Sequence, residues 1–156
     1  MKLSFLCVTL VLLAGCSSPS TEAPPKPVAA VKHLAPTDES RKMPIENRVS
    51  SNTVDDHMLD RQWLPGGTLA HYKKGAREWD LVLVKANSPA AAADWLLDYK
   101  KELDGAKVIP SFGGFFGSDK GRPAFMFTKG SWLAGVIGLT ESEADAVARV
   151  FASRIS

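Results

Sequence analysis

Three carboxylates and one histidine lie close together in the segment Asp55-Asp56-His57-Met58-Leu59-Asp60. Carboxylate oxygens and imidazole nitrogens bind divalent metals, so Asp56, His57 and Asp60 are candidate metal ligands. No second cluster in the chain completes the set, and acidic side chains are also favoured at the start of a helix. We therefore expect a solvated helix start here, and the sequence predicts neither a metal site nor a cofactor.

His71 is the only histidine after residue 60 and the candidate for acid–base chemistry. It alternates with Leu69 and Lys73 along one face of an expected strand. Neither a Ser-His-Asp order nor a nucleophile elbow accompanies it. Asp80 has no evident acidic partner for paired-carboxylate chemistry. The sequence predicts no catalytic residue.

The segment from Phe112 to Gly121 places three phenylalanines among four glycines. Gly121 follows Lys120, so the segment lacks the G-x-x-x-x-G-K-[ST] spacing of a phosphate-binding loop. Exposed phenylalanines would form a contact surface, whereas buried ones would close the open end of a sheet. Both interpretations remain open. Because loops often carry binding function, the candidate contact loop consists of Phe112, Phe115 and Phe116.

The first 16 residues contain a basic start, a short apolar run and the sequence Leu13-Ala14-Gly15-Cys16. The run is shorter than the ~20 apolar residues that a membrane span needs, and its anatomy is typical of a secretory signal peptide. Leu13–Cys16 resembles the lipobox of bacterial lipoproteins. The resemblance implies that residues 1–15 are a signal peptide and that Cys16 becomes a lipidated N-terminus bound to the membrane.

The same resemblance implies a location in the bacterial envelope. Ser17, rather than an Asp, follows the cysteine, which favours the outer membrane, facing the periplasm, in a bacterium with two membranes. Cys7 and Cys16 are the only cysteines, and neither would remain free in the mature chain. Disulfides and thiolate chemistry are therefore not expected.

The composition divides the remainder into a tether and one domain. Residues 16–60 begin with a Pro- and Ser-rich stretch that favours an extended, flexible tether, although Met43, Ile45 and Val49 could dock on the domain. Residues 61–156 form one globular domain with a modest core. The domain has 13 Lys and Arg against 10 Asp and Glu, a net charge of +3, which does not indicate a nucleic-acid partner.

Two amphipathic helices are predicted in the domain. The first follows the N-cap Ser88 and Pro89 and ends at Gly105. The second begins at a Thr140–Glu143 capping box. Each carries an apolar stripe at helical spacing, and the two stripes are offset by 52 residues at all five positions.

Four strands are predicted in two hairpins, over residues 68–86 and 122–139, and residues 107–109 are the candidate for a fifth, short strand. The expected fold is α+β, an antiparallel sheet of four to five strands with both helices on one face. The two hairpin–helix units arose either by duplication or independently, as two occurrences of a common β-β-α arrangement. Trp79 and Trp132 are at the starts of equivalent expected strands, where they either line one groove or pack under the helices.

These observations favour a lipid-anchored envelope lipoprotein whose domain is a non-catalytic accessory or binding module. Its partners would be the membrane, through the lipid on Cys16, and an unidentified envelope protein or ligand. The alternative is a small envelope hydrolase or metal-dependent enzyme. An apolar groove without convergent polar groups would support the module, whereas a pocket joining His71 to acidic residues would support the enzyme.

Overall fold

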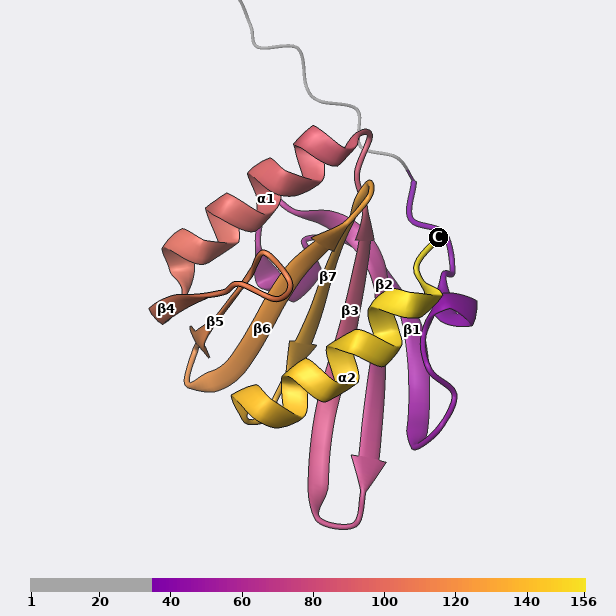
Figure 1. Ribbon diagram of the computed structural model, residues 1–156. Coiled ribbons are helices and arrows are strands. Elements are labelled where there is room, and N and C mark those ends of the chain that lie inside the picture. Colours follow the sequence, from indigo (N-terminus) through magenta and orange to yellow (C-terminus); the bar gives the residue numbers. More distant parts are fainter. Residues whose placement is uncertain (1–34) are drawn as a thin grey trace, which may run out of the picture. The chain divides into compact units, whose positions relative to one another are not determined.

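The computed structural model describes residues 35–156. The predicted signal peptide, Cys16 and the first part of the predicted tether lie outside the described residues. Figure 1 shows the described part as one sheet with two long helices.

The described strands form one antiparallel sheet of seven strands in the order β1-β2-β3-β7-β6-β5-β4. The prediction of four to five strands was wrong, although the α+β class is confirmed. The strands are β1 (Arg48–Asp56), β2 (Pro65–Lys74), β3 (Arg77–Lys85), β4 (Asp104–Ile109), β5 (Gly114–Asp119), β6 (Arg122–Lys129) and β7 (Trp132–Ile137).

The two helices, α1 (Pro89–Glu102) and α2 (Glu141–Arg154), cover opposite faces of the sheet. Successive residues of a strand point to opposite faces, and on β6 the neighbours Met126 and Phe127 belong to different cores. Met126 packs with Leu96 and Tyr99 of α1, whereas Phe127 packs with Phe151 of α2. The prediction that both helices share one face was therefore wrong.

Each helix begins as its sequence predicts. The Ser88 hydroxyl accepts a hydrogen bond from the Ala91 N–H at 3.1 Å, and Pro89 occupies the first turn of α1. At the start of α2, the Glu143 carboxylate accepts hydrogen bonds from the backbone N–H and hydroxyl of Thr140. These bonds hold the pKa of Glu143 below its ordinary value. Capping fixes where a helix starts, but it does not select the face of the sheet that the helix covers.

The two hairpin–helix units are not related by a simple twofold axis. Their inner strands β3 and β7 are antiparallel neighbours, and a twofold axis perpendicular to the sheet would exchange them while keeping both helices on one face. Because α1 and α2 lie on opposite faces, no such axis relates the two units. Any helix that covers a sheet needs an apolar stripe, so the matching stripes do not distinguish a duplication from two independent origins.

Two additional strands come from segments that were expected to be irregular. Residues 114–119 of the phenylalanine–glycine segment form β5, and Arg48–Asp56 pairs along its length with β2 as β1. The folded unit thus extends upstream of the predicted boundary at residue 61. The preceding segment also packs on the domain, because Met43 is buried and the Pro44 carbonyl accepts a 2.6 Å hydrogen bond from Tyr72.

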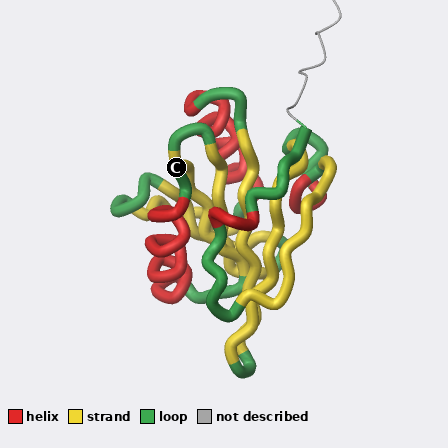
Figure 2. Tube along the Cα trace, turned by 90° about the vertical axis from the view of Figure 1, so that its right-hand side faces the viewer, coloured by secondary structure: helices red, strands yellow, loops and turns green. Residues whose placement is uncertain are grey.

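Two short 3-10 helices complete the structure, η1 (Ser40–Lys42) and η2 (Met58–Asp60). Viewed from the β1 edge, helix α2 lies on one side of the strands, and the segment leading to β1 passes in front of them (Figure 2). The segment is attached to β2 through Thr68, whose hydroxyl accepts from the Glu39 N–H at 2.9 Å. Its residue Met43 packs in the same core as α2.

Candidate functional site

The hairpin of β2 and β3 provides the floor of the candidate site. Gly75 has a φ of +61° at the two-residue turn between Lys74 and Arg77, which fixes the register of the hairpin. Tyr72 and Trp79 are directly opposite each other in this register, and their rings stack at 5.4 Å with an angle of 15°. The turn projects beyond the rest of the sheet in Figure 1.

An apolar groove lies between this hairpin, α2 and the segment before β1. We call it the Trp79 groove. Its first half has a volume of about 240 Å³ and is walled mostly by carbon atoms. The residues that line this half are Pro44, Glu46, Asn47, Tyr72, Trp79, Leu81, Ala146, Val147 and Val150. Val150 is 55 % exposed, so the apolar wall is accessible from solvent.

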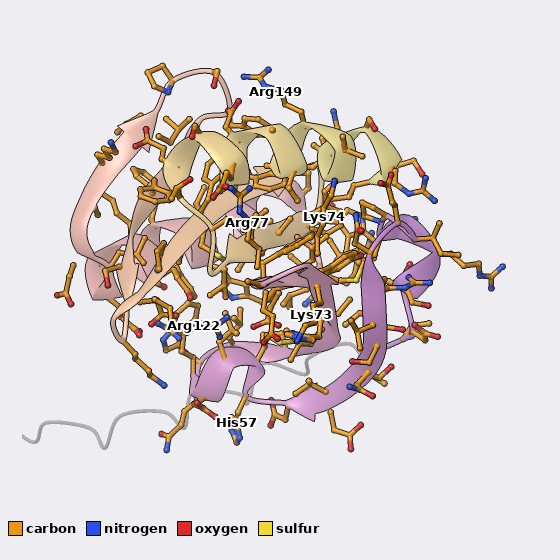
Figure 3. The ribbon with its side chains drawn as sticks, turned by 90° about the horizontal axis from the view of Figure 1, so that it is seen from below. His57, Lys73, Lys74, Arg77, Arg122 and Arg149 are labelled. Atoms are coloured by element: carbon orange, nitrogen blue, oxygen red, sulfur yellow. The ribbon has the colours of Figure 1, made fainter. Side chains whose placement is uncertain are left out.

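The second half of the groove, about 270 Å³, continues along Trp79 and Val147 toward the turn of the hairpin. Its outer end is charged. Arg77 pairs with Glu143 of α2 at 2.5 Å, whereas Lys74 has no ion-pair partner within residues 35–156. Figure 3 shows Lys74 and Arg77 on the side of the hairpin that faces α2, with Lys73 and Arg122 on the other side. The groove is therefore apolar in its middle and charged at its rim.

Trp79 contributes an unusual polar group to this site. The indole is 7 % exposed, and its Nε1–H has no hydrogen-bond partner among the described residues. A buried donor without a partner costs about 1–3 kcal/mol.

Tyr72 holds the groove floor rigid. Its ring is 1 % exposed, and its hydroxyl donates to the Pro44 carbonyl. Burial raises the pKa of Tyr72 to about 12, so the donor stays protonated under ordinary conditions. The bond ties the Pro44 wall of the groove to strand β2.

The opposite face of the same hairpin carries the residues that would be needed for acid–base chemistry. His71 and Asp80 are cross-strand neighbours, with 2.8 Å between Nδ1 and Oδ1. The second oxygen of Asp80 accepts from Arg122 at 2.8 Å, and Glu78 lies 3.9 Å from the other imidazole nitrogen. Ser50 is opposite His71 on β1. The structure thus forms a Ser50–His71–Asp80 row that the sequence analysis did not find.

The turn itself was the signal that could have revealed the His71–Asp80 contact. A two-residue turn between Lys74 and Arg77 sets His71 opposite Asp80 by counting outward along both strands. Ser50 could not be found in the same way, because β1 was not expected. The row lies on an open sheet surface and on the face opposite the Trp79 groove. The Ser50 hydroxyl makes no hydrogen bond to His71, so the geometry lacks an activated nucleophile.

The metal candidates at the η2 turn do not form a ligand set. Asp56 and His57 are 3.5 Å apart, whereas Asp60 lies 3.2 Å from the ammonium of Lys120. Within residues 35–156, no group of three or more His, Cys, Asp or Glu side chains is arranged to hold a metal ion. His57, immediately before η2, and Asp60, the last residue of η2, instead have positive φ angles.

The three phenylalanines of the candidate contact loop have different surroundings. Phe115 is 8 % exposed and packs in the α1 core. Phe112 meets Phe125 and Phe127 edge-on at 5.3 and 5.0 Å, and Phe116 is half-buried against the α2 core. A contact role for Phe112, Phe115 and Phe116 stays a prediction, and the burial of Phe115 favours the interpretation that it closes the sheet.

A buried ionic network that was not predicted from the sequence lies beneath α1. The Arg61 guanidinium donates to Asp119 at 2.8 Å and to the Leu59 carbonyl at 2.9 Å, and it stacks on Tyr99 at 4.1 Å. The Tyr99 hydroxyl donates to the other oxygen of Asp119. Burial and this bond raise the pKa of Tyr99.

Glu102 closes the network at the surface. Its carboxylate lies 2.9 Å from Arg61 Nε, but the N–H does not point at it, so the contact is one of charge rather than a hydrogen bond. Glu102 also accepts from the Trp63 indole at 2.7 Å. The network joins η2, α1 and β5, and we interpret it as structural because its charged centre is enclosed.

We found no match of this chain to a protein-family model, a curated protein or a solved structure. No helix within residues 35–156 is long and apolar enough to cross a membrane.

Proposed function

We propose that this protein is a lipid-anchored envelope protein whose domain binds, without catalysis, an apolar chain of an envelope lipid in the Trp79 groove. The observation that carries the proposal is the groove itself, an open and mostly apolar channel with a charged outer end. Ligand sites in proteins are typically apolar clefts with few polar groups that orient the ligand. The lipobox resemblance would place the domain beside a lipid surface.

The binding energy would come mainly from apolar contact. Tyr72, Trp79 and Leu81 offer a rigid floor, and Val147 and Val150 offer the wall on α2. Each CH₂ group of a ligand that is removed from water contributes about 0.8 kcal/mol. The charged rim at Lys74 and Arg77 would remain in water with the headgroup.

The experiment measures binding of N-phenyl-1-naphthylamine, a neutral apolar fluorophore, and its displacement by a lysophospholipid below its micelle concentration. Val150→Glu adds a charge to the groove wall and should weaken binding at least tenfold, about 1.4 kcal/mol. Leu97→Glu is the matched control, because Leu97 is 50 % exposed on α1, away from the groove. Leu97→Glu should bind as the unmodified protein does.

Equal loss in both variants, or no loss in Val150→Glu, would refute the groove as the binding site. The anchor is tested separately. Cys16→Ser should move the protein from the detergent to the aqueous phase of a Triton X-114 partition, and unchanged partitioning would contradict lipidation at Cys16.

The alternative function, a small envelope hydrolase, is favoured by one observation, the Ser50–His71–Asp80 row. It would require ester hydrolysis that His71→Ala abolishes, measured with p-nitrophenyl acetate. We expect no such activity, because Asp80 is shared with Arg122 and the Ser50 hydroxyl is not bonded to His71. The groove lies on the other face of the sheet, so it cannot position a substrate for this row.

A further inference from the structure

The two edges of the sheet differ in how well they are protected from pairing with another chain. An edge strand exposes unpaired backbone N–H and C=O groups, and proteins usually block such edges with short strands, bulges, lysines or prolines. The β4 edge has all four features: the strand is six residues long, its register with β5 shifts between Asp104 and Lys107, it contains Lys107, and Pro110 follows it. The β1 edge is much less protected.

Strand β1 is nine residues long and faces the viewer in Figure 2. Its centre, Ser50-Ser51-Asn52-Thr53-Val54, contains no lysine, proline or glycine. Its one irregularity is a bulge at Val49, near the start of the strand. From Ser50 to Asp56, the strand keeps regular register with β2, and no other strand of residues 35–156 pairs with its outer edge.

We propose that β1 pairs antiparallel with β1 of a second copy, with Asn52 on the twofold axis. This register joins the sheets of both copies into one. It sets Ser50 opposite Val54 and Ser51 opposite Thr53 of the second copy.

Charge and side-chain direction select this register among the alternatives. Pairing with β2 places Arg48 opposite Tyr72, so the bulge puts Arg48 on the same face as Ser51, Thr53 and Asp55. With Asn52 on the axis, each Arg48 lies opposite Asp55 of the other copy, which makes two cross-strand ion pairs. A shift by one residue would place side chains from opposite faces against each other.

A shift by two residues also loses these pairs. With Ser51 on the axis, Asp55 has no partner residue, and with Thr53 on the axis, Arg48 has none. The register centred on Asn52 therefore has the longest overlap and the only matched charges. A single pair of edge strands is smaller than a standard protein interface, so the association should be weak in dilute solution. Attachment of both copies to one membrane would strengthen it by raising their effective concentration.

Disulfide cross-linking tests the register directly. In the full chain with Cys7→Ser and Cys16→Ser, Asn52→Cys should form a covalent dimer on mild oxidation, because paired β residues fall within disulfide range. Ser50→Cys and Val54→Cys alone should not cross-link, because the two copies of either residue would be about 14 Å apart. An equal mixture of Ser50→Cys and Val54→Cys chains should form the mixed dimer.

Ile45→Cys controls for random collision, because Ile45 is 76 % exposed and outside the strand. Asp55→Lys in the Asn52→Cys chain should slow cross-linking severalfold by replacing two attractions with two repulsions. The proposal is overturned if Asn52→Cys reacts no faster than Ile45→Cys, or if Ser50→Cys alone reacts as fast as Asn52→Cys. Cross-linking of Asn52→Cys to another envelope protein but not to itself would also overturn it.

Discussion

Replacing Arg61 with alanine should destabilise the domain more than any change at an exposed ion pair. The Arg61 side chain is 4 % exposed and Asp119 is 9 % exposed, so neither charge can regain water while the domain stays folded. Burial is the largest single effect on the pKa of Arg61 and acts to lower it, but the hydrogen bond to Asp119 and the charges of Tyr99, Asp119 and Glu102 together raise it. Arg61→Ala leaves the Asp119 carboxylate buried with only the Tyr99 hydroxyl as a partner.

The expected cost is about 3–5 kcal/mol, the range found when one partner of a buried ion pair is removed. A domain of this size has about 5–15 kcal/mol of stability. The melting temperature should therefore fall by about 10–20 °C. Urea unfolding followed by tryptophan fluorescence gives the free energy of unfolding, with far-UV circular dichroism as a second probe of the two-state transition.

Two further variants distinguish a buried pair from general damage. Lys101→Ala removes an exposed pair with Asp98 on α1 and should cost less than about 1 kcal/mol. The double variant Arg61→Met with Asp119→Leu should be more stable than Arg61→Ala, because no charge remains buried. A cost below about 1 kcal/mol for Arg61→Ala would refute the reasoning, as would a double variant no more stable than the single one.

Two other outcomes follow from the packing. Tyr72 and Tyr99 are the only tyrosines in the chain, and burial raises the pKa of both. The protonated tyrosines therefore stabilise the folded domain fully below pH 10, and this contribution is lost as the pH rises through their raised pKa values. The 295 nm absorbance of tyrosinate should therefore appear together with unfolding above pH 10, and ionisation near pH 10 in a folded protein would contradict this. Gly66→Ala would place a Cβ 2.1 Å from the Val54 carbonyl oxygen of β1, so it should cost about 2 kcal/mol or more and speed hydrogen exchange in β1. Gly75→Ala, at an open turn with φ +61°, should cost only about 1–2 kcal/mol and leave that exchange unchanged.

Local patterns in the sequence were sufficient to place both helices and the two hairpins. Ser88, Thr140 and Glu143 determine the helix starts through bonds within one turn, and Gly75 determines the β2–β3 register through its own φ angle. These interactions involve residues close together in the chain. The apolar stripes likewise show that each helix must bury a face, whatever it packs against.

The choice of sheet face required the tertiary structure. Strands β6 and β7 are buried on both sides, and a continuously apolar strand does not show which neighbour covers which side. Strand β1 has a polar sequence because it is an edge strand, so its pairing with β2 gave no hydrophobic signal. In addition, the composition of residues 16–60 favoured a flexible tether, so no strand was expected there.

The candidate sites depend on contacts between distant segments for the same reason. The Trp79 groove combines a hairpin, a helix and the segment at Pro44, and the Arg61 network joins residues 58 positions apart. The lipobox resemblance at Leu13–Cys16 could be recognised from the sequence because its four residues are consecutive in the chain. A groove exists only after folding, since its walls come together through the packing of the core.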